Sequence, residues 1–270
     1  MKKVAVITGA AGGMGLAAAK ILGRDHHLVI SDLHQQNLDA VLAELEREGA
    51  QGTAVACDIT NRASVDALFQ QACHLGPVAC VIHAAGISPQ MANEEAILRV
   101  NALGTINITE AAYSIATEGF ALVNVASMAA HMLPALLIPK RAYARAFTDC
   151  EHFLKKLLFR CRLVPGQFYR RGMAYSLSKH FVIWYSKKNA ARFGEKGARI
   201  LSVSPGTFDT HMGRLEEKSG SVEMLKNAAL KRLGRPEEIA ELLAFCASDK
   251  ASYLTGVDIL CDGGLVASRA

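Results

Sequence analysis

The stretch Thr8-Gly-Ala-Ala-Gly-Gly-Met-Gly15 directly follows the first apolar run of the chain and precedes a segment with helical periodicity. Glycines between a strand and a helix let the backbone turn tightly and approach a pyrophosphate, because no side chain stands in the way. The amino end of the following helix then meets the phosphate charge with backbone N–H groups. This stretch therefore predicts a dinucleotide site at the first strand-to-helix turn.

Apolar runs rich in β-branched residues alternate with helical patterns, which is typical of a parallel sheet covered on both faces. We expect strands at residues 3–8, 27–32, 52–57, 79–83, 120–126, 198–203 and 258–261, and helices that begin near Gly13, Gln35, Arg62, Met91, Ala174 and Pro236. The predicted fold is a Rossmann-like, doubly wound α/β sheet of about seven strands in a single domain, residues 1–270. Ligands of such sheets bind outside the carboxyl ends of the strands.

A second signature is Ala174-Tyr-Ser-Leu-Ser-Lys179, in which Tyr175 and Lys179 stand four residues apart. On a helix these positions share a face, so we expect the Lys179 ammonium to lie near the Tyr175 phenol and to lower its pKa. A phenol tuned in this way can exchange a proton with a carbonyl or an alcohol.

These residues identify a resemblance to the short-chain dehydrogenase/reductase family, classical type. Its TGxxxGxG motif is matched by Thr8, Gly9, Gly13 and Gly15, and its active-site pair by Tyr175 and Lys179. Further matches follow in order along the chain: Cys57-Asp58-Ile59, Ala84-Ala85-Gly86, Asn101, Ser127, Pro205-Gly206, Gly234-Arg-Pro-Glu-Glu238 and Asp262-Gly-Gly264.

The resemblance implies a site for a nicotinamide cofactor, and the acidic residue at the end of the second strand indicates whether NAD or NADP binds. Asp32 lies 23 residues after Gly9, where it would bind the adenosine ribose hydroxyls and repel a 2′-phosphate. Basic residues of NADP-binding members are replaced by Gly12 and Leu33, so we predict NAD; a solvated turn aspartate is the alternative for Asp32. The predicted cofactor-binding residues are Gly9, Gly12, Gly13, Met14, Gly15, Asp32, Leu33, Asp58, Ile59, Ala84, Ala85, Gly86, Tyr175, Lys179, Pro205, Gly206, Thr207 and Thr210.

The implied catalytic residues are Asn101, Ser127, Tyr175 and Lys179, and the implied substrate-binding residues are Ser127, Met128, Tyr175, Phe208 and Met212. Tyr175 would exchange the proton, Ser127 would hydrogen-bond the substrate oxygen, and the Asn101 backbone would position a water that links Lys179 to solvent. His83 stands in His83-Ala-Ala-Gly86 where the family commonly has NNAG, which puts a sheet-bracing hydrogen bond in doubt. We expect His83 to be a packed strand-end histidine rather than a catalyst.

Ser127 and Tyr175 are 48 residues apart, whereas the family gap is roughly a dozen, so we expect a helical insertion at about 133–172. Such additions occur in some hydroxysteroid dehydrogenases and carbonyl reductases. A heptad-like apolar stripe predicts one long helix through Tyr143, Phe147, Cys150, Leu154, Leu157, Cys161 and Val164. This stripe could pack on the chain's own body or on a partner subunit. Alternatively, the insertion is a lid whose basic face attracts an acidic group or an anionic membrane surface.

Charge and cysteine patterns exclude several classes of protein. Residues 134–174 hold nine Lys/Arg and two Asp/Glu, a net charge of +7 in a chain of net +5. The excess positive charge therefore lies in one segment and does not form a protein-wide basic surface for nucleic acid. Seven cysteines form no CxxC pair and nine histidines no HExxH motif, so we predict no metal site and a reducing, cytoplasmic location. No run is long and apolar enough to span a membrane.

Together these features predict an NAD-dependent oxidoreductase that interconverts a secondary alcohol and a ketone, with a hydroxysteroid-like or other bulky apolar substrate. Two alternatives stay open: a 3-oxoacyl thioester reductase that uses NADPH, and a nicotinamide-sensing binding protein without turnover. We expect a homodimer or homotetramer, because the insertion lies beside helices that commonly form the family dimer.

Overall fold

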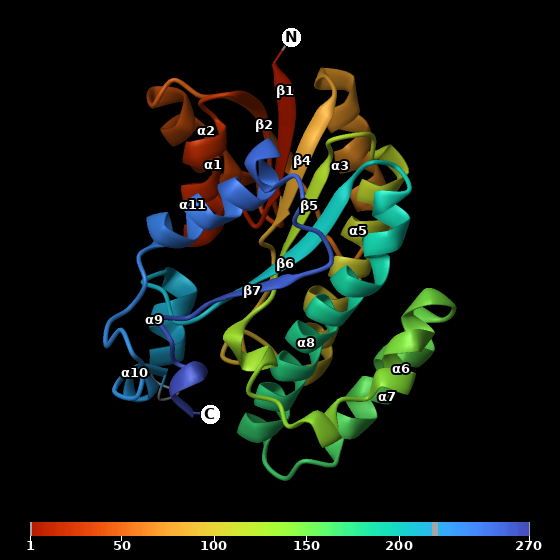
Figure 1. The fold of residues 1–270 in the computed structure, drawn as a ribbon, viewed down its shortest axis with the longest axis vertical. Helices are drawn as coiled ribbons and strands as arrows, with labels where there is room; N and C mark the ends of the chain where they lie inside the picture. The colour runs from red at the N-terminus through yellow and green to blue at the C-terminus, as the bar shows by residue number, and fades with distance from the viewer. Residues whose placement is uncertain (1, 218–220, 270) are drawn as a thin grey trace.

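A parallel sheet forms the centre of the computed structural model, which describes residues 2–217 and 221–269. Its seven strands are ordered β3-β2-β1-β4-β5-β6-β7, and every neighbouring pair is parallel (Figure 1). The strands are β1 (Lys3–Thr8), β2 (His26–Asp32), β3 (Gln51–Ala56), β4 (Val78–His83), β5 (Ala121–Val125), β6 (Arg199–Pro205) and β7 (Asp258–Cys261). The predicted Rossmann-like fold is confirmed, and each strand begins or ends within two residues of the expected position.

Helices cover both faces of the sheet, as an all-parallel sheet requires. On one face lie α1 (Gly13–Leu22), α2 (Gln35–Arg47) and α11 (Pro236–Ala247), which pack on one apolar core. On the other face lie α3 (Arg62–Leu75), α5 (Gly104–Ile115) and α8 (Gln167–Gly194), which pack on a second core. The remaining helices are α4 (Glu94–Leu98), α6 (Lys140–Tyr143), α7 (Cys150–Arg162), α9 (His211–Glu217) and α10 (Ser221–Leu225).

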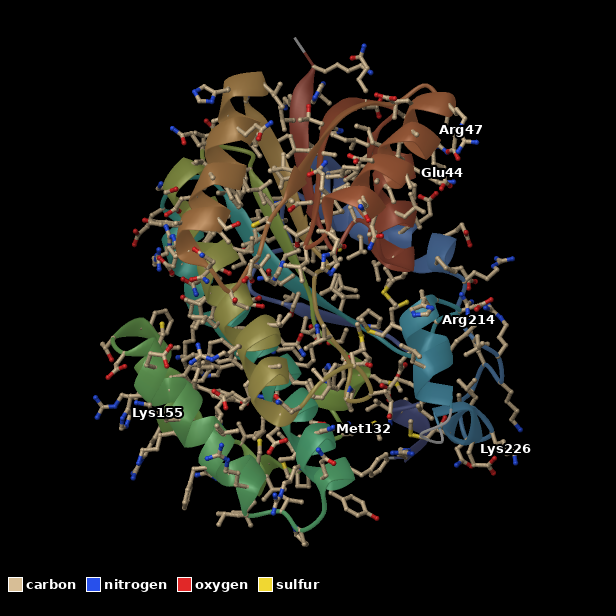
Figure 2. All side chains as sticks on the ribbon, turned by 180° about the vertical axis from the view of Figure 1, so that it is seen from behind. Glu44, Arg47, Met132, Lys155, Arg214 and Lys226 are labelled. Atoms are coloured by element: carbon tan, nitrogen blue, oxygen red, sulfur yellow. The ribbon has the colours of Figure 1, made fainter. Side chains whose placement is uncertain are left out.

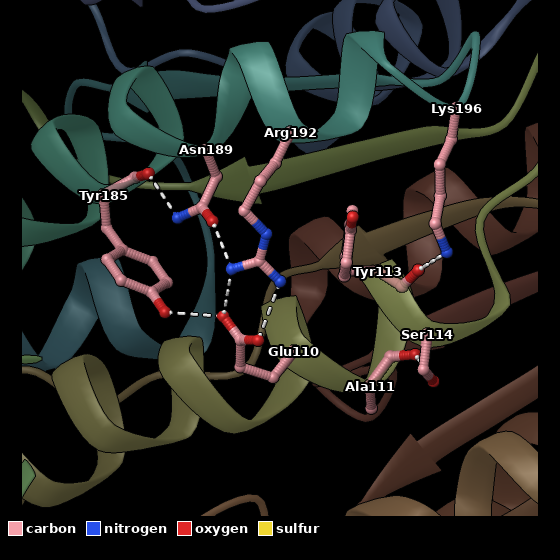
Figure 3. A network of polar contacts seen from close by, with 8 residues as sticks. All are labelled: Glu110, Ala111, Tyr113, Ser114, Tyr185, Asn189, Arg192 and Lys196. Atoms are coloured by element: carbon pink, nitrogen blue, oxygen red, sulfur yellow. Dashed lines mark hydrogen bonds and ion pairs between the residues drawn. The ribbon is translucent and has the colours of Figure 1, made fainter. Parts of the chain in front are cut away.

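The long helix α8 is fixed against α5 by a partly buried polar network (Figure 3). Arg192 on α8 donates to both carboxylate oxygens of Glu110 on α5, at 3.0 and 2.9 Å. The Tyr185 hydroxyl donates to the same carboxylate at 2.9 Å, and Lys196 donates to the Tyr113 carbonyl at 2.7 Å. A bidentate arginine–carboxylate pair fixes geometry as well as distance. The network therefore sets where the earlier turns of α8, which carry Tyr175 and Lys179, meet the sheet.

The helix with Tyr175 begins at Gln167 instead of near Ala174, and the segment before it is not one long helix as predicted. It consists of α6, a 3-10 turn at Ala144–Phe147, and α7. Asp149 interrupts the helix because its side chain accepts a hydrogen bond from the His152 backbone N–H and caps α7. After α7, Pro165 and Gly166, whose φ is +83°, turn the chain into α8.

Residues 133–172 pack on the chain's own body, which was one of the open alternatives. Phe153 and Leu157 of α7 are fully buried in a cluster with Phe181 of α8 and Ile97 of α4. The Tyr143 hydroxyl donates to the Leu177 carbonyl at 2.9 Å. Four members of the predicted stripe are therefore buried as expected: Tyr143, Leu154, Leu157 and Cys161. Phe147, by contrast, is 46% exposed.

We predict that Leu157→Ala lowers the free energy of unfolding by about 2–5 kcal/mol, because it leaves a cavity between α7 and α8. Phe159→Ala, two residues along the same helix, is the matched control. The Phe159 side chain is 62% exposed, so its removal should change stability by less than about 0.5 kcal/mol. Urea unfolding measures both values, and equal losses would show that α7 is not docked as described.

Candidate active site

The carboxyl ends of β1 and β4 approach so closely that a side chain does not fit between them. Gly9 has φ +72°, and a Cβ atom built on it would lie 2.6 Å from the Ala85 nitrogen. The Ala84 N–H donates to the Thr8 carbonyl at 3.1 Å, which extends the pairing of the two strands by one residue. The backbone of residues 8–10 and 84–86 therefore forms a continuous floor at this edge of the sheet.

The glycine turn leads into the amino end of α1 without a side chain over it. Gly12 caps the helix with no side-chain hydrogen bond, and its own N–H donates to the Gly9 carbonyl at 3.0 Å. A Cβ atom on Gly13 would lie 2.8 Å from the Thr210 methyl carbon, and one on Gly15 would overlap the Gly9 carbonyl oxygen. The first helical N–H groups are thus open to an anion, which fits a pyrophosphate.

Asp32 and Asp58 end or follow strands beside this turn. The Asp32 carboxylate accepts from the Ala11 N–H at 3.1 Å and from the Leu33 N–H at 2.8 Å. Each oxygen accepts one of these bonds and keeps a lone pair for a ribose hydroxyl. Asp58 is exposed and accepts from Thr60, whereas Ile59 is buried against Gly104. This arrangement fits an adenosine. Met14 is partly buried against the core, and Leu33 is exposed.

His83 braces the sheet at the departure from the family pattern. Its Nδ1 lies 2.7 Å from the Thr8 hydroxyl, and its Nε2 lies 3.2 Å from the hydroxyl of Thr105 on α5. Burial, aided by the Lys179 charge, lowers the pKa of His83 to about 3, so the ring is neutral. The histidine thus supplies the hydrogen bonds that the missing asparagine put in doubt, and its prediction as a packed residue is confirmed.

Lys179 is the buried cation of the site. Its side chain is 6% exposed, and its Nζ donates to the carbonyl of Val125, the last residue of β5, at 2.9 Å. A Cβ atom on Gly86 would lie 3.2 Å from this Nζ and 3.1 Å from the Asn101 Oδ1. Burial lowers the pKa of Lys179 to about 8. The three residues therefore converge on one point at the sheet edge.

Asn101 lies in a π-helical turn, Arg99–Leu103, between α4 and α5. Its side-chain oxygen accepts from the Ile87 N–H, and its amide donates to the Ile87 carbonyl, both at 2.9 Å. The amide also donates to the Ser178 hydroxyl at 3.3 Å. Sequence reasoning gave a role only to the backbone of Asn101, but its side chain ties the loop after β4 to α8. Single π-helical turns often occur at functional sites.

Tyr175 is half-buried on α8, and Ser127 is buried at the end of β5, where its hydroxyl accepts from the Ala129 N–H at 3.2 Å. Burial raises the pKa of Tyr175, a hydrogen bond with the Ser127 hydroxyl lowers it, and the Glu216 carboxylate raises it. The net shift is upward, so the predicted lowering by Lys179 does not hold in this structure. The Lys179 ammonium donates to Val125 instead, as described above.

The loop after β6 closes onto the glycine turn. The Gly206 N–H donates to the Cys261 carbonyl at 2.8 Å, and the Thr207 carbonyl accepts from the Gly234 N–H at 3.0 Å. Thr210 is buried against Gly13. Residues Pro205 to Thr210 therefore lie beside the floor formed by β1 and β4, as predicted from their place after a strand.

The residues predicted to contact the substrate differ in their exposure. Phe208 is 5% exposed and packs against Gly234 within the sheet core, so it offers no surface to a ligand in this conformation. Met128 is buried in a small cluster with Ala228 and Leu265, and Met212 is half-buried on α9. The segment from Thr207 to Leu225, which carries Phe208 and Met212, includes residues 218–220, which lie outside the described residues.

A cavity of about 320 Å³ beside Tyr175 was not found from the sequence. Its lining residues are Pro89, Leu133, Val164, Phe168, Tyr169, Gly172, Met173, Ser176 and Glu216. Glu216 on α9 is its one charged lining residue, and this carboxylate accepts from the Gln90 N–H at 3.2 Å across the cavity rim. Met173 and Ser176 flank Tyr175 in the sequence, which was the available signal, but the contributions of Val164, after α7, and of Glu216 on α9 depend on tertiary packing.

The described residues, 2–217 and 221–269, contain no group of three or more His, Cys, Asp or Glu side chains placed to hold a metal ion. Within the same residues no helix combines the length and apolarity needed to cross a bilayer.

Comparison with known proteins agrees with this geometry. Residues 3–142 match the family model described as short chain dehydrogenase, and residues 165–266 match one described as enoyl-(acyl carrier protein) reductase. The chain belongs to the short-chain dehydrogenase/reductase family. Its sheet order and its glycine turn are those expected for a classical member of that family.

Three similar proteins illustrate the range of the family. A short-chain dehydrogenase/reductase, bsc3, of Alternaria brassicicola is 29% identical over 97% of this chain and 95% of its own. The 3-oxoacyl-[acyl-carrier-protein] reductase FabG of Thermotoga maritima is 28% identical over 98% of each chain. An actinorhodin polyketide ketoreductase solved with NADPH has a TM-score of 0.78 at 20% identity, covering 98% of this chain and 97% of its own. The last similarity concerns the fold alone.

We predict a pH-dependent stability that depends on Lys179. The unfolded ammonium keeps its proton up to about pH 10.5, whereas the folded one loses it above about pH 8. Between these values the unfolded state binds more protons, so stability should rise with pH by up to about 1.4 kcal/mol per unit relative to Lys179→Met. Urea unfolding across this range measures the difference, with the exposed Lys250→Met as control. A difference between wild type and Lys179→Met that stays constant with pH contradicts this electrostatic description.

Proposed function

We propose that this short-chain dehydrogenase/reductase is an NAD-dependent enzyme that interconverts a secondary alcohol and a ketone. The observation that carries the proposal is the joint placement of Tyr175, Ser127 and Lys179 at the carboxyl end of the sheet, beside an apolar cavity. Each side chain alone has a plain structural use, but together they would supply an acid/base, a hydrogen-bond donor and a cation for one reaction.

In the oxidation direction the alcohol hydroxyl lies between Tyr175 and Ser127. Tyr175 would accept the hydroxyl proton. NAD, when bound, would supply the acceptor for the hydride that the carbinol carbon loses. Ser127 donates a hydrogen bond to the substrate oxygen and stabilises the charge that develops there. Reduction reverses both transfers, with Tyr175 as the proton donor.

The raised pKa of Tyr175 has to fall for it to act as a base near neutral pH. With the cofactor bound, the oxidised nicotinamide ring and a Lys179 ammonium turned away from Val125 would both act in this direction. Lys179 would also donate a hydrogen bond to the nicotinamide ribose, at the expense of its hydrogen bond to the Val125 carbonyl. Asn101, through Ile87 and Ser178, fixes the loop beside Lys179 and leaves its own backbone to position a water for proton exchange with solvent.

NAD rather than NADP is supported by Asp32, whose carboxylate faces the Ala11 N–H on the glycine turn. This carboxylate would hydrogen-bond the ribose hydroxyls and repel a 2′-phosphate. The remaining contacts are proposed from placement: Gly9, Gly12, Gly13, Met14 and Gly15 at the pyrophosphate, Asp58 and Ile59 at the adenine, Ala84, Ala85 and Gly86 along the ribose, and Pro205, Gly206, Thr207 and Thr210 at the carboxamide.

A bulky apolar substrate, such as a hydroxysteroid-like alcohol, is supported by the size and apolar lining of the cavity. Val164, Phe168 and Tyr169 come from the segment that we propose to be an insertion at about 133–172, and residues 143–164 lie between the two family matches. We retain one domain for residues 1–270, since one sheet spans the chain. A homodimer or homotetramer in the cytoplasm remains our proposal for assembly and location.

A second candidate function is a 3-oxoacyl thioester reductase that uses NADPH. It is favoured by the similarity to the 3-oxoacyl-[acyl-carrier-protein] reductase of Thermotoga maritima and by the basic segment 134–174, and Asp32 weighs against it. A nicotinamide-sensing binding protein is the third alternative, and the complete set of Asn101, Ser127, Tyr175 and Lys179 weighs against that reading.

We predict that Tyr175→Phe lowers kcat by about 100- to 10,000-fold for every alcohol or ketone that the wild type converts, because it removes the proton-transfer group. Turnover is followed by NADH absorbance over a panel of steroid, aliphatic and acyl substrates. Tyr113→Phe on α5 is the matched control and should keep wild-type rates. Undiminished activity of Tyr175→Phe across that panel would refute the catalytic role.

We predict that Asp32→Ser shifts the ratio of kcat/KM for NAD to that for NADP toward NADP by about 10- to 100-fold, because a charged hydrogen-bond acceptor is lost and repulsion is relieved. Asp58→Ser is the control: its place at the adenine predicts equal losses with both cofactors. A wild type that prefers NADPH would contradict the assignment of NAD.

A further inference from the structure

The described residues leave twelve large hydrophobic side chains exposed, and seven of them fall between residues 136 and 169. The same segment of the chain carries the excess positive charge, since residues 134–174 have a net charge of +7 and the rest of the chain has −2. Exposed apolar patches on a soluble chain mark interaction sites when they are contiguous.

One face of α7 combines both features. Lys155, Lys156, Phe159, Arg160 and Leu163 share the side of the helix that points away from the buried Leu154, Leu157 and Cys161. Figure 2 shows Lys155 directed away from the body of the molecule. Phe159 and Leu163 are 62% and 68% exposed and stand one helical turn apart.

The turn from α7 to α8 continues this face at one end of the molecule (Figure 1). Phe168 and Tyr169 are 54% and 66% exposed and form an edge-to-face pair with centroids 5.5 Å apart. The Arg170 guanidinium donates to the Val164 carbonyl at 2.8 Å, which fixes the turn beneath them. The basic-aromatic surface is defined here as Lys155, Lys156, Phe159, Arg160, Arg162, Leu163, Phe168 and Tyr169.

The positive charge of this surface is not neutralised within the part of the chain that the structure describes. The four cations of α7 have no ion pair to those residues. The two acidic residues of the segment are engaged elsewhere: Asp149 caps α7, and Glu151 pairs with Arg99 at 3.1 Å. An anionic partner would therefore meet four available charges.

We propose that the basic-aromatic surface docks the protein on an anionic phospholipid bilayer, with Phe159, Leu163, Phe168 and Tyr169 inserted at the headgroup level. Helices that lie at the membrane–water interface typically combine lysine and arginine with exposed leucine and aromatic side chains. A second copy of the chain, docked through the same face, would bring one +7 segment against another, which is unfavourable.

The cavity beside Tyr175 opens within this surface. Val164, Phe168 and Tyr169 line it and flank the turn that would touch the bilayer. An apolar alcohol or ketone dissolved in the membrane would enter this cavity directly from the lipid. This part rests on the proposed function, whereas membrane docking itself does not require turnover.

Vesicle co-sedimentation of the full chain tests the docking. Wild type should bind vesicles of phosphatidylcholine with phosphatidylserine and bind weakly to phosphatidylcholine alone, and added salt should weaken the binding. Lys155→Gln with Lys156→Gln should reduce binding by about 30-fold, at roughly 1 kcal/mol for each lysine. Lys231→Gln with Lys250→Gln, the same charge change outside the segment, should leave binding intact.

Phe159→Ser with Leu163→Ser should weaken vesicle binding by at least about ten-fold. Tyr253→Ser, at a fully exposed site elsewhere, should leave vesicle binding unchanged. Tyr175→Phe should bind vesicles like wild type while losing turnover, so a wild type that binds but converts nothing removes only the proposed function. No binding of wild type to anionic vesicles overturns the proposal. So does a dimer in sedimentation equilibrium that the Phe159 and Leu163 variant dissociates without any vesicle binding.

Discussion

A buried ammonium that needs a partner organises this active site. The Lys179 Nζ donates to the Val125 carbonyl at 2.9 Å and thereby ties α8 to the carboxyl end of β5. An unpaired buried charge would be costly, so the position of α8 and the end of β5 are coupled. Tyr175 lies one turn earlier on α8, Ser127 follows β5, and Asn101 holds the loop that carries Gly86 against the same ammonium. Displacing Lys179 would therefore disturb every group of the site.

The fold and the edge of the sheet where ligands bind could be read from the sequence because they depend on local patterns. Strand lengths follow from β-branched runs, and Gly9 and Gly13 mark positions where Ala85 and Thr210 leave no room for a Cβ atom. His83 is instructive, since it departs from the family pattern and yet makes the expected brace through Thr8 and Thr105. A change of side-chain type can preserve a contact that a motif comparison puts in doubt.

Other features depend on tertiary packing and could not be predicted. A heptad-like stripe predicted one helix, but Asp149 interrupts it, because a capping side chain outweighs periodicity. Phe208 was expected in the pocket and lies in the core against Gly234. The pKa of Tyr175 was expected to fall, but burial and Glu216 raise it, and Glu216 reaches the site from α9. The last two features depend on contacts between segments that are far apart in the sequence, which no local pattern shows.

The structure of the protein with bound NAD tests the central claim most directly. The account predicts the pyrophosphate at the amino end of α1, the adenosine ribose on Asp32, and the nicotinamide at the cavity with Lys179 against its ribose and the Tyr175 hydroxyl facing the substrate volume. A nicotinamide placed away from Tyr175, or a dinucleotide bound without contact to the glycine turn, would contradict it.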